Sequence, residues 1–436
     1  MVIENSLTLI TEIYEALWVL ILGAVAACWV HVLRNWDTFQ VDPSFARERK
    51  PGSQDPHIVF LIAARYSSPI VQKTIDTIPP NCRINDFDDY EIKVVVDNDR
   101  YSLRNAQVIV VPPDYICSSK YKSRSLNYAL QFLPNSQRDW IFHLDEDTLV
   151  TSGGIAKIIS HIQKGGKPVS NGPSLFPCDK EHGLKLFGKL GEAQRHWTFY
   201  WLASMLKGGN PLWLNGSNLL IRSDVEHSVG WNFGIAFSED RRFGYEAHKK
   251  FGRGIFGWHG GLTFEQYSAS VEGLVKQRRR WAAGAVVNYS YVPQVLQLKV
   301  RRLYALMAVV MGAIFCLLGL ILGPIIQPSL LPIFYYGMAV TGCLWLARYL
   351  LGLHMNLKFS DLPRRERFLH YLGLLLAPVV EITCGLAATV GMISRPTVFD
   401  ITPKKGSLSA ASTDTSTIAS PQIRLPISAE PEHQTS

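Results

Sequence analysis

The sequence has few cysteines and none of the spacings that would give them a structural role. Seven cysteines are scattered over 436 residues, with no CxxC pair and no Cys/His array. This pattern argues against a zinc site and against a disulfide framework, so we expect reduced thiols. Internal repeats are also missing, which argues against a repeat architecture.

Basic residues are missing ahead of the first apolar run. That leading segment contains Glu4, Glu12 and Glu15 but no Lys or Arg, whereas a secretory signal begins with basic residues. We therefore interpret the run Ile13–Leu33 as a retained anchor. Basic residues begin at Arg34, directly after the run, which places the following region in the cytosol by the positive-inside tendency.

Three more apolar runs approach the roughly 20 residues needed to cross a bilayer. They are Leu303–Ile326, Leu331–Met355 and Leu369–Ile393. A buried core helix is the alternative for each. The runs predict a multi-pass integral membrane protein of the endomembrane system or plasma membrane, with the large domain between the first two runs facing the cytosol. Basic residues lie on both sides of the last run, so the side of the membrane that the C-terminal tail occupies is not decided. Alternatively, one of the runs is interfacial or re-entrant and does not cross the membrane.

The formal net charge of +8 does not require a nucleic acid partner. Much of the basic excess flanks the apolar runs or lies within residues 276–302. Anionic lipid headgroups or a diphosphate are sufficient partners for such charge. The charge pattern therefore predicts membrane lipids as partners and no nucleic acid.

An α/β domain is predicted between the first two apolar runs. Helices are expected at Val71–Ile78 and Ser123–Phe132, and strands at His57–Ala64, Glu91–Val96, Ala106–Val111 and Trp140–Leu144. Strands that alternate with helices form a mostly parallel sheet, which gathers ligands beyond the carboxyl ends of its strands. Asp97 and Asp145 both occupy such ends.

Two later helices are predicted. Leu184–Leu206 mixes aromatic and basic residues, which is typical of an amphipathic helix on a membrane surface, with an ordinary domain helix as the alternative. Another helix begins near Asp240 and ends near Gly252. The predicted domains are 1–50 (anchor and linker), 51–265 (cytosolic α/β domain), 266–302 (interfacial segment), 303–395 (membrane helices) and 396–436 (disordered tail).

The cluster Asp145-Glu146-Asp147 follows a strongly apolar strand. Two carboxylates separated by one residue can bind Mg²⁺ or Mn²⁺ together with diphosphate oxygens, because these hard cations prefer oxygen ligands. We predict Asp145 and Asp147 as metal ligands. A solvated acidic turn is the alternative.

Three residues upstream are predicted to bind a nucleotide-containing donor. Asp97 follows the apolar Val94-Val95-Val96 and can accept hydrogen bonds from a base or ribose, with a turn aspartate as the alternative. Lys122 and Arg124 lie near the start of the next predicted helix, where a phosphate would meet them. Surface charges are the alternative for these two residues.

Ser238-Glu239-Asp240 opens a predicted helix, and Glu239 and Asp240 are predicted as catalytic residues. Carboxylates at a helix start often serve only as favourable caps. The alternative is that Asp240 removes the proton from an acceptor hydroxyl, which is general-base help worth on the order of 10²–10⁴-fold in rate.

The segment Gln277–Trp281 is strongly basic. Gln277, Arg280 and Trp281 share one helical face by their spacing. Arg280 can hold a departing diphosphate, and Trp281 offers a flat surface for a sugar ring. A basic juxtamembrane helix with an interfacial Trp is the alternative.

Two ionisable residues lie within predicted spans, where such side chains usually face protein or water. They are Arg348 and Glu381. We expect them to pair with each other or to line a path for lipid or glycan. Snorkelling is the alternative for Arg348.

The ordered set Asp97, Asp145-Glu146-Asp147, Ser238-Glu239-Asp240 and Gln277–Trp281 resembles the family 2 glycosyltransferases, which include cellulose and hyaluronan synthases. The resemblance covers approximately residues 57–285 and the flanking spans. Within that group, the layout looks most like the egghead-type β-1,4-mannosyltransferases.

This resemblance implies an α/β fold of the GT-A type, inserted between an N-terminal transmembrane helix and a C-terminal transmembrane cluster. It also implies inverting transfer from a nucleotide sugar with Mg²⁺ or Mn²⁺. Donor-binding residues would be Asp97, Lys122, Arg124, Asp145, Gln277 and Arg280. Asp240 would be the base, and Trp281, Gly216 and Ser217 would contact the acceptor.

One departure from the family pattern concerns base recognition. Many members carry an acidic residue shortly after the first strand, where this chain has Ala64-Arg65-Tyr66-Ser67. The sequence therefore does not decide between a uridine and a guanosine nucleotide in the donor. The leading hypothesis is transfer from GDP-mannose or a UDP-sugar to a lipid-linked or glycan acceptor. The alternatives are a processive polysaccharide synthase that extrudes its polymer and a non-enzymatic membrane scaffold.

Overall fold

The computed structural model describes residues 2–40, 42–48, 54–181, 183–234, 237–311 and 332–394. The predicted tail 396–436 and most of the apolar run 303–326 lie outside these residues.

A seven-stranded mixed sheet forms the centre of the molecule, in the order β3-β2-β1-β4-β8-β6-β9. The strands β3, β2, β1 and β4 are parallel, whereas β8 runs antiparallel to both of its neighbours. The bounds are β1 His57–Tyr66, β2 Tyr90–Asn98, β3 Gln107–Val110, β4 Asp139–Asp145, β6 Val169–Asn171, β8 Leu219–Arg222 and β9 Phe256–Trp258.

A small second sheet has the order β5-β10-β7. Its strands are β5 Leu149–Val150, β7 Ser174–Leu175 and β10 Thr263–Phe264. Because β5 follows the acidic cluster and pairs with β10, this sheet brings residues near 265 beside Asp147.

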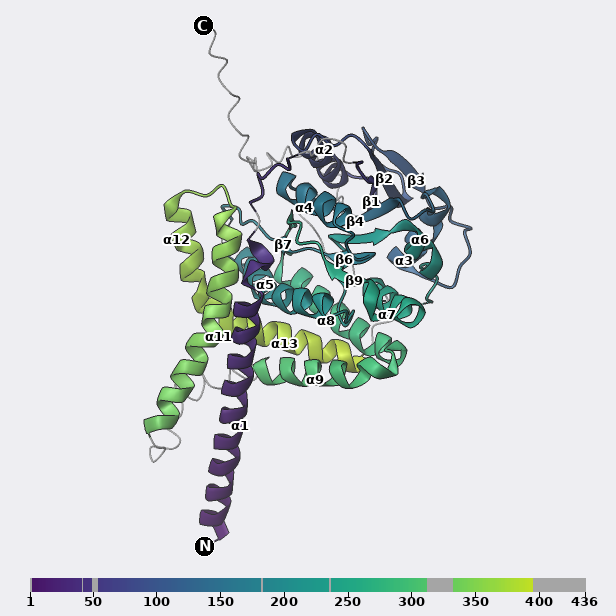
Figure 1. Ribbon diagram of the computed structural model, residues 1–436. Coiled ribbons are helices and arrows are strands. Elements are labelled where there is room, and N and C mark those ends of the chain that lie inside the picture. Colours follow the sequence, from purple (N-terminus) through teal and green to yellow (C-terminus); the bar gives the residue numbers. More distant parts are fainter. Residues whose placement is uncertain are drawn as a thin grey trace.

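Helices cover the sheet and extend away from it (Figure 1). The α-helices are α1 Val2–Arg34, α2 Pro69–Ile84, α3 Tyr121–Ala129, α4 Ser152–Gln163, α5 Lys185–Lys207, α6 Ser223–Val229, α7 Glu239–Phe251, α8 Val271–Val287, α9 Gln294–Met311, α11 Pro332–Lys358, α12 Arg364–Leu372 and α13 Ala377–Ser394. Short 3-10 helices are η1 Trp36–Phe39, η2 Leu130–Phe132, η3 Arg253–Ile255, η4 Asn288–Tyr291 and η5 Gly373–Leu376.

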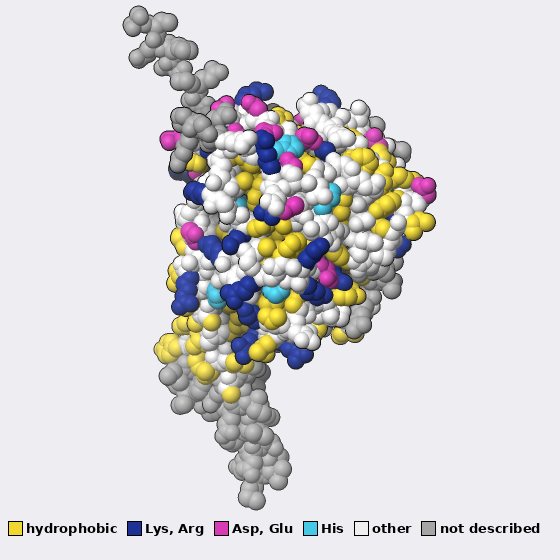
Figure 2. Space-filling model, turned by 45° about the vertical axis from the view of Figure 1, so that its right-hand side comes forward, with side chains coloured by type: hydrophobic (Ala, Val, Ile, Leu, Met, Phe, Trp, Pro, Cys, Tyr) yellow, Lys and Arg dark blue, Asp and Glu magenta, His cyan; other side chains and the backbone are white. Residues whose placement is uncertain are grey.

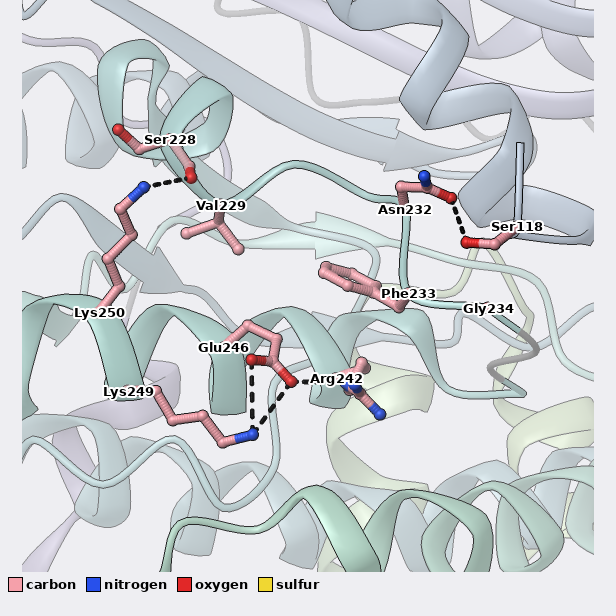
Figure 3. A pocket seen from close by; sticks show the side chains of 10 residues that line it. All are labelled: Ser118, Ser228, Val229, Asn232, Phe233, Gly234, Arg242, Glu246, Lys249 and Lys250. Carbon is pink, nitrogen blue, oxygen red and sulfur yellow. Dashed lines mark hydrogen bonds and ion pairs between the residues drawn. The ribbon is translucent and has the colours of Figure 1, made fainter. Parts of the chain in front are cut away.

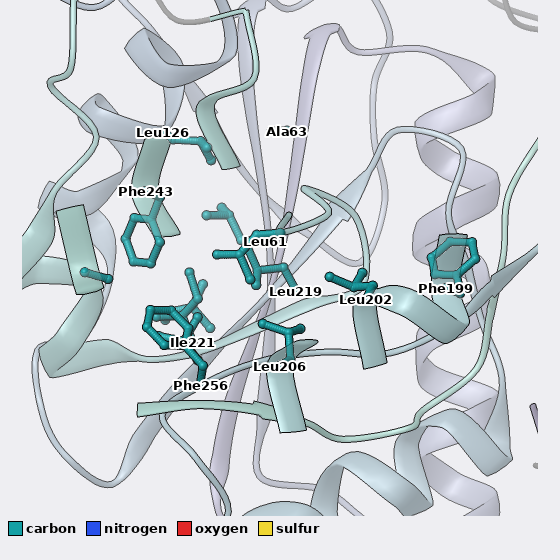
Figure 4. Close-up of a cluster of buried hydrophobic side chains, with 14 of the residues drawn as sticks. Leu61, Ala63, Leu126, Phe199, Leu202, Leu206, Leu219, Ile221, Phe243 and Phe256 are labelled. Atoms are coloured by element: carbon teal, nitrogen blue, oxygen red, sulfur yellow. The ribbon is translucent and has the colours of Figure 1, made fainter. Parts of the chain in front are cut away.

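The strand β1 is apolar on both faces because helices cover both sides of the sheet. Leu61 and Ala63 face a core that includes Leu202 and Leu206 of α5 and Phe243 of α7 (Figure 4). The alternate residues of β1 face a second core formed with α2 and α4. The domain is therefore a three-layer α/β/α arrangement.

The predicted α/β domain is confirmed, and the four predicted strands and two helices coincide with β1–β4, α2 and α3. The prediction of a mostly parallel sheet is correct only for the half of the sheet formed by β1–β4. The strands β6, β8 and β9 are three or four residues long, so no alternating pattern marked them in the sequence. The added antiparallel strand makes the sheet mixed.

The helix α5 matches the predicted Leu184–Leu206 helix, but it is a packed domain helix rather than one lying on a membrane surface. Most of its apolar side chains are buried, among them Leu190, Trp197 and Leu206. Its glycine Gly188 lies so close to the Ser268 carbonyl that a side chain there would clash. The alternative interpretation given for this segment is therefore the correct one.

A buried polar network holds β4 in place. Glu226 of α6 is fully buried, lies 3.0 Å from His143 Nε2 of β4, and accepts a 2.7 Å hydrogen bond from Trp231 Nε1. Replacing Glu226 with alanine leaves two buried nitrogen groups without this partner. We expect the free energy of unfolding to fall by about 2–4 kcal/mol. Thermal unfolding measures this, with Glu272→Ala in the exposed first turn of α8 as the control that should leave the midpoint unchanged.

Two of the described helices are long and apolar enough to cross a membrane, judged by length and composition. They are Tyr336–Lys358 and Arg364–Ser394, and Trp18–Arg34 is a shorter apolar helix. In Figure 1, α13 lies across the α/β domain at a steep angle to α1 and α11, and it packs on α8. The last apolar run therefore contacts the α/β domain through α8.

The expected pairing between the two intraspan ionisable residues is present. Arg348 of α11 donates a 3.0 Å hydrogen bond to Glu381 of α13, and both side chains are buried. Tyr349 also donates to the same carboxylate. The pair therefore links α11 to α13.

The surface changes character where the helices leave the domain. In Figure 2, apolar side chains gather beside the protruding helices, and Lys and Arg side chains lie in a band next to them. Exposed apolar residues on α1, α11 and α13 include Leu20, Leu33, Tyr336, Leu386 and Ile393. An apolar zone bordered by cations is the surface expected at a membrane interface.

Candidate active site

Two carboxylates mark the carboxyl edge of the parallel strands. Asp97 is the penultimate residue of β2 and Asp145 is the last residue of β4, and both strands pair with β1. The register aligns Asp145 with Ala63 and places Asp97 next to Val96, the partner of Ala64. The two aspartates are therefore on the same edge of the sheet, with one strand between them.

A lysine connects the first acidic cluster to the second. Lys122 Nζ of α3 donates a 2.5 Å hydrogen bond to Asp145 Oδ1 and lies 3.8 Å from Glu239 Oε1 of α7. Burial lowers the pKa of Lys122, but the carboxylates of Asp145 and Glu239 outweigh burial and raise the pKa above its usual value. Lys122 therefore stays a cation between the two acidic clusters.

Asp240 and Lys122 both lie next to the loop that contains Gly216. A methyl group at Gly216 would be 3.5 Å from both Asp240 Oδ2 and Lys122 Nζ. Burial raises the pKa of Asp240 to about 7, and the neighbouring Glu239 adds to the rise, while Arg241 and Lys122 oppose it. A carboxyl with this pKa is suited to take a proton near neutral pH.

The start of α7 is positioned by α8 and η4. Asn288 Nδ2 donates a 3.0 Å hydrogen bond to the Ser238 carbonyl oxygen. A side chain at Gly284 would come within 2.4 Å of Ser238 Oγ, so this close approach requires glycine. The helix with the Gln277–Trp281 segment therefore fixes the residue just before Glu239 and Asp240.

Asp145 and Asp147 are the residues that could hold a divalent cation together with a phosphate ligand. Asp147 is buried, and its Oδ2 accepts a 3.0 Å hydrogen bond from the Gln266 backbone. Among the described residues, no three His, Cys, Asp or Glu side chains form a metal-binding group. Mg²⁺ commonly takes only one or two carboxylates and completes its shell with phosphates and water. The two carboxylates fit that kind of site.

Two further predicted donor residues, Asp97 and Arg124, lie beside each other. Asp97 Oδ1 accepts a 3.0 Å hydrogen bond from Ser125 and lies 3.6 Å from Arg124 Nη1. The Arg124 guanidinium also donates to the carbonyl oxygens of Pro112 and Tyr115. Arg124 therefore supports the loop before α3 and has fewer donors left for a phosphate.

Ser217 contacts Glu265, a buried carboxylate that was not predicted from the sequence. Its hydroxyl donates to the buried Glu265, which lies just after β10. Glu265 Oε2 is 4.0 Å from Arg195 Nη1 of α5. A lone glutamate after a two-residue strand carries no sequence signal, and its position depends on the long-range pairing of β10 with β5. Only the fold reveals it.

The predicted donor and acceptor face of α8 is only partly open. Gln277 is buried, Arg280 and Trp281 are half-buried, and Gln277 Oε1 has no hydrogen-bond partner among the described residues. The Trp281 ring lies under two guanidinium groups, with Arg195 Cζ 4.7 Å and Arg278 Cζ 4.5 Å from its centre. Neither arginine belongs to the predicted site.

A cavity of about 650 Å³ lies along α7 and contains none of the predicted site residues (Figure 3). Within it, Glu246 accepts from Lys249 and pairs with Arg242 at 2.8 Å. Its charges are thus partly paired with one another. The candidate site is therefore placed at the strand ends and the first turn of α7, where Lys122 lies between Asp145 and Glu239.

The arrangement as a whole can support group transfer. Its parts are an acidic pair suited to metal-bound phosphate, a cation beside it, and a carboxyl with a raised pKa next to a glycine loop. The acidic pair and the carboxyl come from different elements but meet through Lys122. A group bound at the acidic pair would therefore lie near both Lys122 and Asp240.

Comparisons with known proteins identify the family. Residues 140–392 match the family described as glycosyl transferase family group 2. Beta-1,4-mannosyltransferase bre-3 of Caenorhabditis elegans is 25% identical over 374 residues, which cover 80% of this chain and 79% of the relative. Beta-1,4-mannosyltransferase egh of Drosophila melanogaster is 26% identical over 259 residues, which cover 55% of this chain and about half, 54%, of the relative.

A solved structure with a similar chain course is the mannosyltransferase PcManGT from Pyrobaculum calidifontis in complex with GDP-Man and Mn²⁺. It is 13% identical, covers 87% of this chain and 100% of its own, and has a TM-score of 0.40. This likeness is too weak to add to the assignment. The family match covers more than half of the sequence, so the chain belongs to glycosyl transferase family group 2 and is a glycosyltransferase enzyme.

Proposed function

We propose that this enzyme is an inverting, metal-dependent mannosyltransferase that uses GDP-mannose, is embedded in a membrane and acts on a lipid-linked or glycan acceptor. The observation that carries the proposal is the meeting of Lys122, Asp145 and Asp240 beside Gly216. The choice of mannose is supported by the names of the relatives, which are β-1,4-mannosyltransferases. The membrane is supported by the two long apolar helices.

In the proposed mechanism, Asp240 takes the proton from an acceptor hydroxyl. The acceptor oxygen then forms a bond to the anomeric carbon while the bond from that carbon to the diphosphate breaks, so the configuration inverts. Asp145 and Asp147 would hold Mg²⁺ or Mn²⁺, which when bound neutralises charge on the diphosphate. Lys122 supplies a fixed positive charge on the same side.

Asp97 is proposed to accept hydrogen bonds from the nucleoside. It lies at the end of the neighbouring parallel strand, at the same sheet edge as Asp145. Ligands of open α/β sheets bind beyond this edge. Gln277 has a buried oxygen without a partner among the described residues, which suits a hydrogen bond to a bound ligand.

A donor screen tests the proposal. Full-length enzyme in membranes, with Mn²⁺ or Mg²⁺, should release GDP from GDP-mannose when a glycoside acceptor is present, and EDTA should abolish the release. Because the cation is required for departure of the diphosphate, adding it back should restore activity. Release of UDP from a UDP-sugar would contradict the proposed GDP-mannose donor. A long polymeric product would show processive synthesis and contradict single transfer.

A further inference from the structure

A buried network of charged side chains lies behind Trp281 and outside the predicted site. Glu192 of α5 has no exposed side-chain surface and sits between two arginines. Its Oε2 accepts a 2.9 Å hydrogen bond from Arg195 Nη1, and its Oε1 lies 3.5 Å from Arg278 Nη2 of α8. We call Arg195 and Arg278 the arginine pair.

The arginine pair is tied to both elements that are proposed to meet the acceptor. Both guanidinium groups lie over the Trp281 ring, each less than 5 Å from its centre. Arg195 also reaches Glu265, which holds the Ser217 hydroxyl. The network therefore joins the indole of α8 to the loop beside Asp240.

The composition of the network indicates a fixed geometry. The two arginines face two buried carboxylates, Glu192 and Glu265, and Asp145 also attracts the Arg195 guanidinium. Arg278 Nη2 also donates a 2.7 Å hydrogen bond to the Gly191 carbonyl oxygen, which locks its planar group against α5. Arginine is suited to this place because its flat guanidinium can bind a carboxylate and lie on an aromatic ring at the same time.

We propose that the arginine pair, oriented by Glu192, holds the Trp281 ring in the position that binds the acceptor sugar. The inference rests on the proposed function and adds to it the residues that position the acceptor side. The half-buried indole keeps part of its surface accessible. Arg195 and Arg278 are thus positioning residues that act through Trp281, and the ligand is a pyranose glycoside.

An arginine-to-lysine variant tests whether the flat shape of the guanidinium matters, because lysine keeps the positive charge but not the planar group. Arg195→Lys keeps a cation for Glu192 but loses the flat group over the indole. We expect the KM for octyl β-glucoside, octyl β-galactoside or octyl β-mannoside, whichever is the acceptor, to rise about tenfold. The KM for GDP-mannose and the acceptor-independent hydrolysis of GDP-mannose should stay unchanged. Arg47→Lys is the matched control, because Arg47 forms a largely buried pair with Asp55 at the amino end of β1.

A double-mutant cycle distinguishes positioning from a general structural role. In a Trp281→Leu background, Arg195→Lys should cause no further rise in the acceptor KM, because the ring that it positions is gone. Independent, multiplying effects of the two changes would overturn the proposal. So would a parallel fall in donor hydrolysis.

Binding provides a readout that does not need turnover. If wild-type enzyme processes no nucleotide sugar, the proposed function fails, and ligand-observed NMR of the three octyl glycosides still tests the network. Wild type and Arg47→Lys should bind a glycoside, whereas Arg195→Lys and Trp281→Leu should show weakened binding. Equal binding by all four proteins, or binding by none, would overturn the inference.

Discussion

Replacing Asp240 with asparagine should lower the rate of sugar transfer by about 10²–10⁴-fold, because an amide cannot take the proton from the acceptor hydroxyl. The substitution preserves the shape of the side chain, so the fold and the KM for the donor should change little. GDP release in the presence of acceptor measures the effect. Glu246→Gln, further along α7, is the control and should retain wild-type rates.

The same substitution should change how stability depends on pH. Burial raises the pKa of Asp240 to about 7 in the folded enzyme, whereas the unfolded chain has the ordinary carboxyl value. The folded state therefore binds more protons between these two values, and stability falls as pH rises through that range. Asp240→Asn removes this contribution, so above pH 7 the variant should unfold at a higher temperature than wild type. An unchanged or lower midpoint would contradict the assigned environment of Asp240.

Replacing Asp145 with asparagine is the second change with a large expected effect. The variant should lose about 10²–10³-fold in kcat/KM, because it removes a proposed metal ligand and the carboxylate that pairs with Lys122. The concentration of Mn²⁺ needed for half-maximal activity should also rise. Both quantities follow from GDP release measured over a Mn²⁺ titration.

Asp139 offers a matched control for this second prediction, since it lies on the same strand at its opposite end. Asp139 Oδ1 lies 2.8 Å from His57 Nδ1 and is remote from the carboxyl edge of the sheet. Asp139→Asn should therefore leave the Mn²⁺ dependence as it is in wild type. An equal loss in both variants would mean that the strand, and not the metal site, was disturbed.

The parallel half of the domain could be predicted from the sequence because its signals are local. Long apolar runs marked β1 and β2, and β4 ended directly in an acidic cluster. The carboxyl-edge rule then placed Asp97 and Asp145 on one side of the sheet without any long-range information. The pairing of Arg348 with Glu381 was likewise expected from the cost of isolated charge in an apolar span.

What could not be predicted depends on contacts between distant parts of the chain. Glu265 reaches the site through the pairing of β10 with β5, and Glu192 and Arg195 reach it through the packing of α5 under the sheet. The aromatic and basic residues of α5 suggested a membrane surface, but they pack against Phe39, Trp281 and the network behind the site. A helix of this composition has the same sequence pattern whether it lies on a membrane surface or packs inside a domain.

The pH dependence of kcat/KM for transfer from GDP-mannose tests the central claim most directly. Since Asp240 must be deprotonated to act as the base, kcat/KM should rise with pH and level off above an apparent pKa near 7. This rise should disappear in Asp240→Asn. A wild-type profile that is flat between pH 5 and 8, or a rise that persists in Asp240→Asn, would contradict the assignment of Asp240 as the base.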